Sequence, residues 1–512
     1  MTGHWITLLT FLPLVGALTV AWGGPRSGAA RRRVALLVHA LVAMSAMGLA
    51  VAFDTSATGM QFVERLSWVP GLGVEYHVGV DGLGMVSVLI AALIPLLAAV
   101  VSDRVAAGRE GVYYPLLLLL QFGLLGTFTA LNFFHWFLFW ELGLVPAYLL
   151  VRLFGGKGAG PASFQFFVYT MVGSVALLLA FLALRAAGGS FDFLELAGAD
   201  RGGALGRALA QRLPWGGPDA GNVLGWLVFG GVLLGFAVKV PLWPFHTWLP
   251  DTYTAAPSPV TMVLTGAMSK MGVYGLLRIA WPIFPEHFAA AQGVLVPLAL
   301  ATVILPTFTA FVQRDLKRVL AYSSINHLGY CLLAVFVVGT PGSEAGTAAA
   351  LNGVVLQMLN HALTAATLFG FVEVLERRTG GVRDLEAFGG LRRAAPVFCG
   401  LMGISVFASV GLPGLNGFVS EFLIFRGIFA AAPWAAAVAS LGLLTTAVFL
   451  LKVMQRLFHG ELSVAWVGFP DLTMRERVWT GAAVAGMLVL GVYPDLVLQW
   501  TNPLVLRLAG GN

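Results

Sequence analysis

The feature that most constrains this chain is a succession of apolar runs, each long enough to cross a lipid bilayer as a helix. A helix needs about 20 apolar residues to span the hydrocarbon layer, and about fourteen runs of that length can be placed. Of the residues, 58% are hydrophobic and 11% are charged, which excludes an ordinary water-soluble domain. We therefore predict an all-α integral membrane protein with about 14 transmembrane helices. The predicted helices cover 4–22, 34–53, 83–101, 113–131, 133–154, 162–186, 222–241, 257–280, 290–312, 317–339, 351–376, 396–430, 435–458 and 475–500.

The basic residues favour one orientation of these helices. If the N-terminus lies outside the cytoplasm, the loops that face the cytoplasm hold most of the lysines and arginines, including Arg31–Arg33 and Arg377–Arg378. Such an excess is the usual mark of cytoplasmic loops. We therefore predict a multi-pass protein of the cell inner (cytoplasmic) membrane with both termini outside the cytoplasm.

The sequence offers few means of holding a metal cluster or a nucleic acid. Its two cysteines, Cys331 and Cys399, lie in different apolar runs, so neither an iron–sulfur cluster nor a structural zinc site is expected on this chain. The basic residues are dispersed among the loops, which argues against binding of nucleic acid. Lipids are the expected surroundings, and no cofactor or metal is predicted here.

Six ionisable residues stand out within the predicted spans, where a charge costs about 2.5–3.5 kcal/mol even on gentle scales. One such group could be a paired structural residue, or a side chain that reaches the membrane surface. A series of acids, lysines and histidines at similar depth is instead what transfer of protons requires, because burial and neighbours can bring their proton affinities together. The residues are Glu141, Lys239, Lys270, His327, His361 and Glu421.

Two of the predicted spans contain helix-breaking residues. Pro241, Pro244 and Pro250 follow Lys239 closely, and the glycine- and proline-rich segment 408–417 precedes Glu421. Proline removes an amide donor and interrupts a helix. The two breaks fall in the seventh and twelfth spans, which run in opposite directions. This spacing predicts two inverted five-helix repeats, each containing a broken helix, although ordinary kinks of membrane helices would also explain the breaks.

Several motifs resemble the antiporter-like subunits of respiratory complex I, the proton-pumping NADH:quinone oxidoreductase. The resemblance covers roughly residues 75–500 and is closest to the M type, the mitochondrial subunit-four type. It implies translocation of protons by a subunit that carries no redox centre itself. The motifs are Phe139–Leu142, Ala237–Asp251, Ser269–Arg278, Ala321–Gly329 and Gly411–Glu421.

For the first half of the chain, the resemblance implies a pair formed by Glu141 and Lys239, whose opening and closing alters the proton affinity of the site. Lys270 is similar to the central relay lysine of the family, and His246 is expected near it.

For the second half, the resemblance implies that His327 and His361 relay protons towards Glu421 at the exit. The L- and N-type relatives and the Mrp-type cation/proton antiporter subunits typically hold a lysine at this last position. The glutamate therefore points to the M type.

The resemblance also implies an organisation and a set of partners. Helices 1–3 and an outer loop are expected in 1–112, the two repeats in 113–282 and 283–460, and the last helix in 461–512. NADH, FMN, iron–sulfur clusters and quinone are expected on partner subunits, and other membrane subunits, especially antiporter-like ones, on either side of this chain.

The segment between Asp251 and Lys270 departs from the family pattern. Where relatives usually hold a histidine and a glutamate, this chain has Tyr253 and Ala255, and Ser269 before the lysine is also atypical. These departures leave open a photosynthetic or hydrogenase-type complex. The sequence is also compatible with a subunit of a Mrp-type Na⁺/H⁺ antiporter, or with a scaffold whose buried charges carry no protons.

Overall fold

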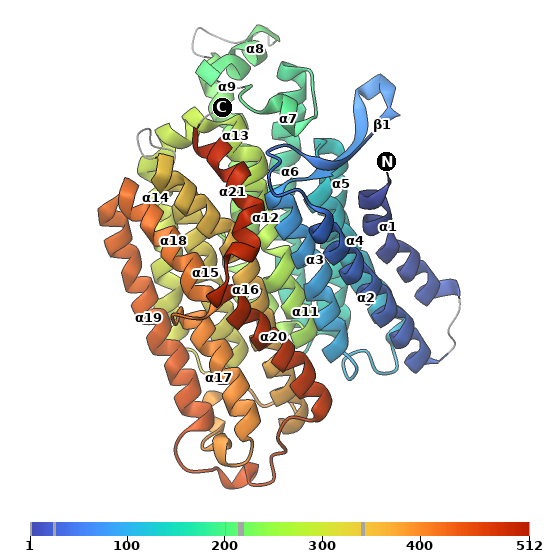
Figure 1. Cartoon of the computed structure of the whole chain (residues 1–512), viewed down its shortest axis with the longest axis vertical. Helices are drawn as coiled ribbons and strands as arrows, with labels where there is room; N and C mark the ends of the chain where they lie inside the picture. Colours follow the sequence, from blue (N-terminus) through green and yellow to red (C-terminus); the bar gives the residue numbers. More distant parts are fainter. Residues whose placement is uncertain (1–2, 24–26, 200, 213–219, 339–343, 511–512) are drawn as a thin grey trace.

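The computed structural model describes residues 3–23, 27–199, 201–212, 220–338 and 344–510, and forms a bundle of long helices packed side by side (Figure 1). Within these residues, twelve helices are long and apolar enough to cross a membrane, or thirteen if the bent pair at the C-terminal end counts as one span. The unbroken spans are α1 (Trp5–Leu18), α2 (Gly28–Ala52), α3 (Gly82–Val101), α4 (Glu110–Thr129), α5 (Phe133–Phe154), α6 (Ala159–Gly188), α9 (Ala220–Lys239), α14 (Pro285–Phe311), α15 (Leu316–Val337), α16 (Glu344–Thr379) and α19 (Pro433–Phe458).

One further span, Ser258–Ile283, is assembled from short pieces. It consists of α11 (Ser258–Val263), α12 (Lys270–Gly275) and α13 (Trp281–Ile283), joined by two π-helical turns, Leu264–Met268 and Leu276–Ala280. The described residues in this span are buried almost throughout, so it forms the centre of the bundle.

The helical membrane fold predicted from hydropathy is confirmed, and both predicted breaks are present. The seventh span ends at Lys239 and resumes as α10 (Trp248–Ala255); the twelfth is divided into α17 (Pro396–Val410) and α18 (Asn416–Ala431). The last span was predicted as continuous, and this was wrong. It divides at Pro494 into α20 (Met474–Val492) and α21 (Asp495–Gly510), which meet at 57°. The count of fourteen spans stays a prediction.

The two longest intervals between the predicted helices, after residue 53 and after residue 186, contain regular structure. Residues 54–80 include an antiparallel hairpin of β1 (Gln61–Val69) and β2 (Val74–Val80). The hairpin lies at the upper end of the bundle in Figure 1, together with α7 (Phe193–Leu196) and α8 (Ala204–Arg212) from the second loop. Hydropathy locates membrane spans but does not detect hairpins and short helices in polar segments.

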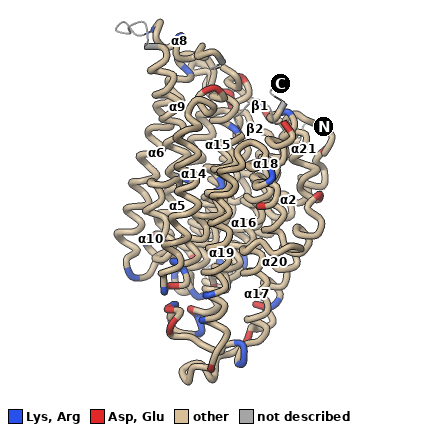
Figure 2. Tube along the Cα trace, turned by 90° about the vertical axis from the view of Figure 1, so that its left-hand side faces the viewer, with Lys and Arg blue, Asp and Glu red and all other residues tan. Residues whose placement is uncertain are grey.

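The prediction that both termini lie on one side of the membrane requires both ends of the chain to lie at one end of the bundle. Both lie towards this upper end (Figure 1). Many of the charged residues gather at the opposite, lower end (Figure 2). There, arginine–carboxylate pairs join segments far apart in the sequence: Arg377 to Asp103, Arg378 to Glu476, and Arg383 to Asp315. Arg383 also pairs with Glu376, seven residues earlier. These ion pairs therefore connect the lower loops to one another.

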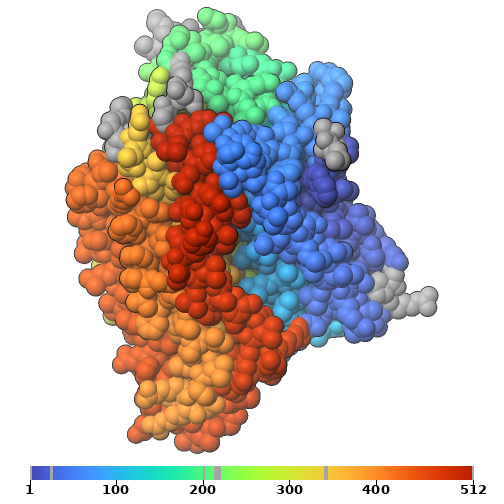
Figure 3. All heavy atoms as spheres, viewed as in Figure 1, coloured from blue at the N-terminus to red at the C-terminus, as the bar shows by residue number. Residues whose placement is uncertain are grey.

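The two halves repeat one order of elements. Three long helices are followed by a broken helix and a fifth span, first from α4 and then from α14. The C-terminal helices α20 and α21 lie along the surface between the N-terminal helices and α18 (Figure 3). This order accords with the predicted repeats, whose inverted relation and boundaries stay predictions.

Candidate functional site

Lys239 is the last residue of α9 and is placed by the first helix break. Pro241 cannot donate an amide hydrogen bond, and the Leu242 amide bonds instead to the carbonyl of Ala237 at 2.7 Å. The Val238 carbonyl, released from the helix, accepts a hydrogen bond from the Trp248 indole at 3.1 Å. A cation at a helix C-terminus is favoured by the helix dipole, so the break supplies a suitable place for the Lys239 ammonium.

Lys239 is only 3% exposed, and its ammonium lies 4.7 Å from the ring centroid of Trp140. Glu141, the next residue on α5, is near enough for its charge to act on Lys239. No ion pair within 4 Å joins the two among the described residues, and Glu141 Oε1 is buried without a hydrogen-bond partner. The structure therefore places the predicted pair together with its carboxylate and ammonium apart.

His246 occupies the segment between α9 and α10. Its ring is half-buried, and its Nδ1 has no hydrogen-bond partner among the residues described. No hydrogen bond among the described residues joins His246 to Lys270, whose ammonium contacts Thr265, Ser269 and His361 instead. The expected proximity of His246 to Lys270 stays a prediction.

Lys270 begins α12, directly after a π-helical turn that creates its binding environment. The Ser269 amide bonds to the carbonyl of Leu264 five residues earlier at 3.0 Å, rather than to that of Thr265. The Thr265 carbonyl instead accepts the Lys270 ammonium at 2.5 Å and the Ser269 hydroxyl at 2.8 Å. Single π-turns within helices recur at functional sites because they expose carbonyls in this way.

Four of the predicted residues form one connected cluster. Lys270 Nζ lies 2.7 Å from His361 Nδ1 on α16. The rings of His361 and His327 have centroids 5.3 Å apart, and His327 Nδ1 lies 3.0 Å from Glu421 Oε1. All four residues are at most 5% exposed. Residues 270 and 421 are thus linked across the two halves of the chain.

The second helix break positions Glu421. Gly411 ends α17 with a φ of +84°, a conformation that glycine adopts without cost. A Cβ at this position would lie 2.7 Å from Glu421 Oε2, so the carboxylate occupies the space that a side chain would fill. Ser409, just before the break, lies 3.1 Å from His327 Nε2. The break therefore supports both members of the His327–Glu421 pair.

Several polar residues around this cluster were not predicted from the sequence. The carboxamide of Asn326 on α15 contacts Tyr330 OH at 3.3 Å and Thr446 at 3.1 Å. Asn360 donates to the carbonyl of Asn416 at 2.7 Å, at the start of α18. Neutral side chains of this kind give no hydropathy signal, and only the fold shows which groups they contact.

Glu373 and Lys317 are ionisable residues that were also missed. Glu373 is 5% exposed near the lower end of α16, 3.9 Å from Arg377. Lys317 is 1% exposed in the first turn of α15 and donates to the carbonyl of Ala256. Glu373 stands inside a predicted apolar run, so the signal used for the other six residues could have found it; Lys317 stands at the edge of its run.

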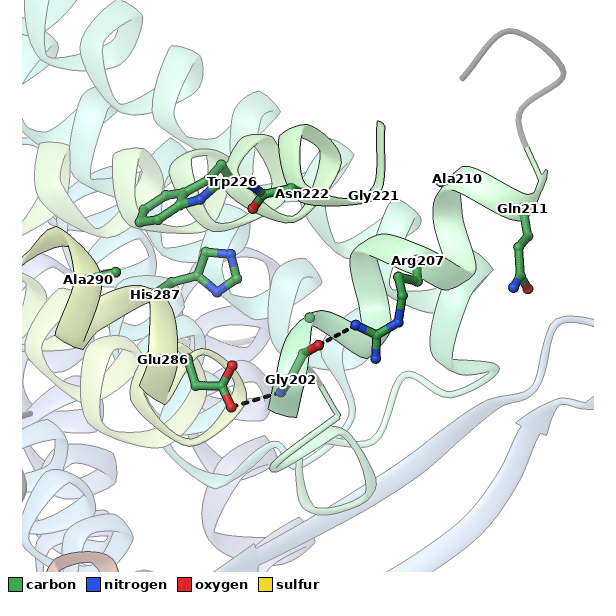
Figure 4. Close-up of a pocket in the computed structure, with 11 residues that line it drawn as sticks. Gly202, Arg207, Ala210, Gln211, Gly221, Asn222, Trp226, Glu286, His287 and Ala290 are labelled. Carbon is green, nitrogen blue, oxygen red and sulfur yellow. Dashed lines mark hydrogen bonds between the residues drawn. The ribbon is translucent and has the colours of Figure 1, made fainter. Parts of the chain in front are cut away.

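A cavity of about 670 Å³ lies elsewhere, between α8, α9 and α14 (Figure 4). Glu286 accepts a hydrogen bond from the Gly202 amide at 2.8 Å, and Arg207 donates to the carbonyl of the same residue. Trp226 and His287 meet edge to face with ring centroids 4.7 Å apart. These contacts hold the upper loop on the bundle, and none of the predicted site residues lines the cavity.

The chemistry available to the cluster is transfer of protons. Lysine, imidazole and carboxylate can each bind and release a proton, and burial can bring their affinities towards one another. No group of three or more histidine, cysteine or acidic residues suited to a metal ion occurs in the described part of the chain. The geometry therefore suits a proton relay.

Comparison with known proteins agrees with this chemistry. The family model of the transmembrane subunits of NADH:quinone oxidoreductase and Mrp antiporters matches residues 130–448. The chain belongs to this family. The match runs from the start of α5 into α19 and includes the breaks, the cluster and all seven predicted site residues.

Relatives within the NADH:quinone oxidoreductase/Mrp antiporter family match almost end to end. Subunit M of the Rhodobacter capsulatus NADH-quinone oxidoreductase is 34% identical, covering 98% of this chain and 96% of its own. Chain 4 2 of the Thermosynechococcus vestitus NAD(P)H-quinone oxidoreductase is 34% identical, over 97% and 90%. A chain of respiratory complex I from Thermus thermophilus superposes with a TM-score of 0.84 at 31% identity, covering 99% of each chain.

Proposed function

We propose that this chain is a proton-translocating membrane subunit of a complex I-type NADH:quinone oxidoreductase, of the M type. The observation that carries the proposal is the buried cluster of Lys270, His361, His327 and Glu421, which links the two halves through side chains that bind protons. Full-length relatives named subunit M support the same assignment. Redox chemistry would take place on partner subunits that carry NADH, FMN, iron–sulfur clusters and quinone.

In this proposal, the distance between Glu141 and Lys239 controls the direction of transfer. As Glu141 approaches, the Lys239 ammonium is stabilised and retains its proton; as Glu141 withdraws, the buried ammonium loses that support and releases the proton towards Lys270. Each proton moved against 100 mV costs about 2.3 kcal/mol. Between these states, the Lys239 ammonium is stabilised by its contact with the face of the Trp140 ring.

From Lys270, the proton would pass through His361 and His327 to Glu421. An imidazole can accept a proton at one nitrogen and release one at the other. The two nitrogens of His327 face Glu421 and Ser409, an arrangement suited to this exchange. Release from Glu421 is proposed towards the outer side of a cell inner membrane, with both termini on that side and neighbouring antiporter-like subunits as partners.

The test is substitution of Lys239 by alanine in the assembled complex, with Lys452→Ala as the control. Lys452 is also a lysine near an aromatic ring, 4.6 Å from Phe311, but it lies at the surface outside the cluster. We expect Lys239→Ala to abolish NADH-driven acidification of inverted membrane vesicles, with oxidation of NADH by an artificial acceptor unchanged. Normal pumping by Lys239→Ala would refute the scheme, and pumping that depended on sodium would favour a Mrp-type antiporter subunit.

A further inference from the structure

The segment that departs from the family pattern, Asp251 to Lys270, borders the gap between the two lysines of the first half. A small enclosed cavity lies there, with Lys239 on its wall. Its volume is about 10 Å³, which is near the lower limit for one water molecule. Besides the Lys239 ammonium, two polar side chains line it, Tyr253 and Ser269.

The other walls of this cavity cannot carry a proton. Phe166, Leu264 and Met268 are apolar, and the indole N–H of Trp248 donates to the Val238 carbonyl at 3.1 Å. A proton that crosses this space therefore has the hydroxyls of Tyr253 and Ser269 as its protein carriers.

Ser269 contacts Lys270 directly, and Tyr253 lies beside Ser269. Ser269 Oγ lies 3.4 Å from Lys270 Nζ. The phenol of Tyr253 lies beside the hydroxyls of Thr265 and Ser269. Its ring is 1% exposed and meets Phe369 edge to face, with centroids 6.1 Å apart, which fixes its orientation.

Close packing keeps the two lysine-bearing segments at this separation. A Cβ at Gly272 would lie 2.5 Å from Val240 Cγ2, and one at Gly275 would lie 2.2 Å from the Phe236 ring. Only glycine at these two positions lets α12 approach the end of α9 so closely. The separation of the two segments is therefore set by backbone packing and does not depend on the lining hydroxyls.

We propose that the hydroxyls of Tyr253 and Ser269, with one water between them and Lys239, form the proton connection from Lys239 to Lys270. This inference rests on the proposed function and names two relay residues that stand where the family pattern differs. A hydroxyl can donate one hydrogen bond while accepting others, so each passes on one proton as it receives one. The Lys239 ammonium becomes an amine, the Lys270 amine becomes an ammonium, and both hydroxyls are regenerated after they turn.

The water in this connection has enough partners to be held. Buried waters make about three hydrogen bonds, and Lys239, Tyr253 and Ser269 supply three polar atoms around the cavity. Removal of either hydroxyl leaves two, and removal of both leaves one ammonium in an apolar space.

The experiment uses the assembled complex carrying Tyr253→Phe, Ser269→Ala or both. Tyr253→Phe removes a single oxygen from a fixed ring, and Ser269→Ala removes the other hydroxyl. We expect the double variant to lower the rate of NADH-driven proton pumping about tenfold or more, with NADH oxidation by an artificial acceptor unchanged. Ser269→Thr and Tyr253→His keep groups that donate and accept, and we expect both to retain pumping.

Two control variants match these changes away from the cavity. Tyr114→Phe removes the hydroxyl of another fully buried tyrosine. Ser87→Ala removes a buried serine that donates to the carbonyl four residues earlier at 2.8 Å, as Ser269 does. Both controls are expected to pump normally.

The outcomes separate this inference from the proposed function. If Lys270→Ala abolishes pumping while the double hydroxyl variant pumps at the control rate, the hydroxyl connection is refuted and the proposed function stands. If Lys270→Ala pumps normally, the proposed function fails, and this inference fails with it. Equal losses in the hydroxyl variants and in Ser269→Thr would assign the two side chains to packing and overturn the relay.

Discussion

At the scale of single residues, His327 is the best-defined member of the cluster. Its two ring nitrogens face a carboxylate and a hydroxyl at 3.0 and 3.1 Å, and the residue is 3% exposed. In the proposed relay, Glu421 is both the hydrogen-bond partner of His327 and the group that takes up its proton.

Replacement of Glu421 by glutamine tests the need for an ionisable group at this position while the size of the side chain is kept. Glutamine keeps the size and a hydrogen-bonding oxygen but cannot bind a proton at neutral pH. We expect proton pumping by inverted vesicles to fall about tenfold or more, while assembly of the complex and NADH oxidation by an artificial acceptor remain normal. Glu421→Asp should retain part of the rate. Full pumping by Glu421→Gln would remove Glu421 from the relay.

At the scale of elements, the two helix breaks place the ends of the buried chain of groups. The first exposes the end of α9 at Lys239, and the second ends α17 at Gly411 beside the Glu421 carboxylate. Breaks of this kind are tolerated in a membrane only where the freed backbone groups find partners in the protein. The Trp248 indole provides one such partner for α9.

Gly411→Ala tests the second break, and Gly460→Ala is its matched control. Both glycines have a φ of +84°, where alanine costs about 1–2 kcal/mol. At Gly460 a Cβ meets nothing within 4 Å, whereas at Gly411 it meets the Glu421 carboxylate. We expect both variants to lower thermal stability and only Gly411→Ala to lower pumping. Equal pumping by the two variants would contradict the role given to this carboxylate position.

Hydropathy and helix-breaking residues predicted much of this fold. Apolar runs located the long helices, and Pro241 and the 408–417 segment located the breaks, because both signals are local. The π-helical turn before Lys270 could not be predicted, because it depends on how the surrounding helices pack rather than on a residue type. The break at Pro494 followed the same proline rule and was overlooked because the apolar run continues through it.

The candidate site was predictable as a set of residues and not as a geometry. Burial cost singles out each ionisable residue separately, but the contact between Lys270 and His361 joins positions 91 residues apart. The family resemblance implied closeness of His246 to Lys270, and this stays a prediction. Neutral partners such as Ser409 lie within a segment that the sequence singled out, but nothing in the sequence shows that Ser409 contacts His327.

At the scale of the whole molecule, the β-hairpin connects distant segments at the upper end. Val78 pairs with Ala130, and Asn132 pairs with Asp192. His77 Nδ1 lies 2.5 Å from Asp192 Oδ2, with both side chains buried. Burial raises the pKa of Asp192, but the hydrogen bond and charge of His77 and two backbone amides outweigh it, and the pKa lies below the ordinary value of 3.8.

This pair predicts a pH-dependent contribution to stability. Because the pKa of Asp192 is depressed on folding, its contribution is present above the ordinary value and is lost as pH falls through the folded value. A hydrogen bond to a charged group is worth about 1.5–3 kcal/mol. We therefore expect Asp192→Asn to lower the thermal midpoint at pH 7. The difference from the parent should vanish in strong acid, and a difference that persisted there would contradict this assignment.

The small cavity between Lys239 and Lys270 also bears on the membrane when the complex is idle. A continuous file of water through this chain would let protons flow back and dissipate the gradient that the complex builds. The cavity has room for about one water between the apolar side chains of Phe166, Leu264 and Met268. A continuous file of water therefore cannot pass this point. In the proposed relay, the apolar walls make each proton transfer depend on two hydroxyls. The same walls prevent protons from flowing back across the membrane when the complex is idle.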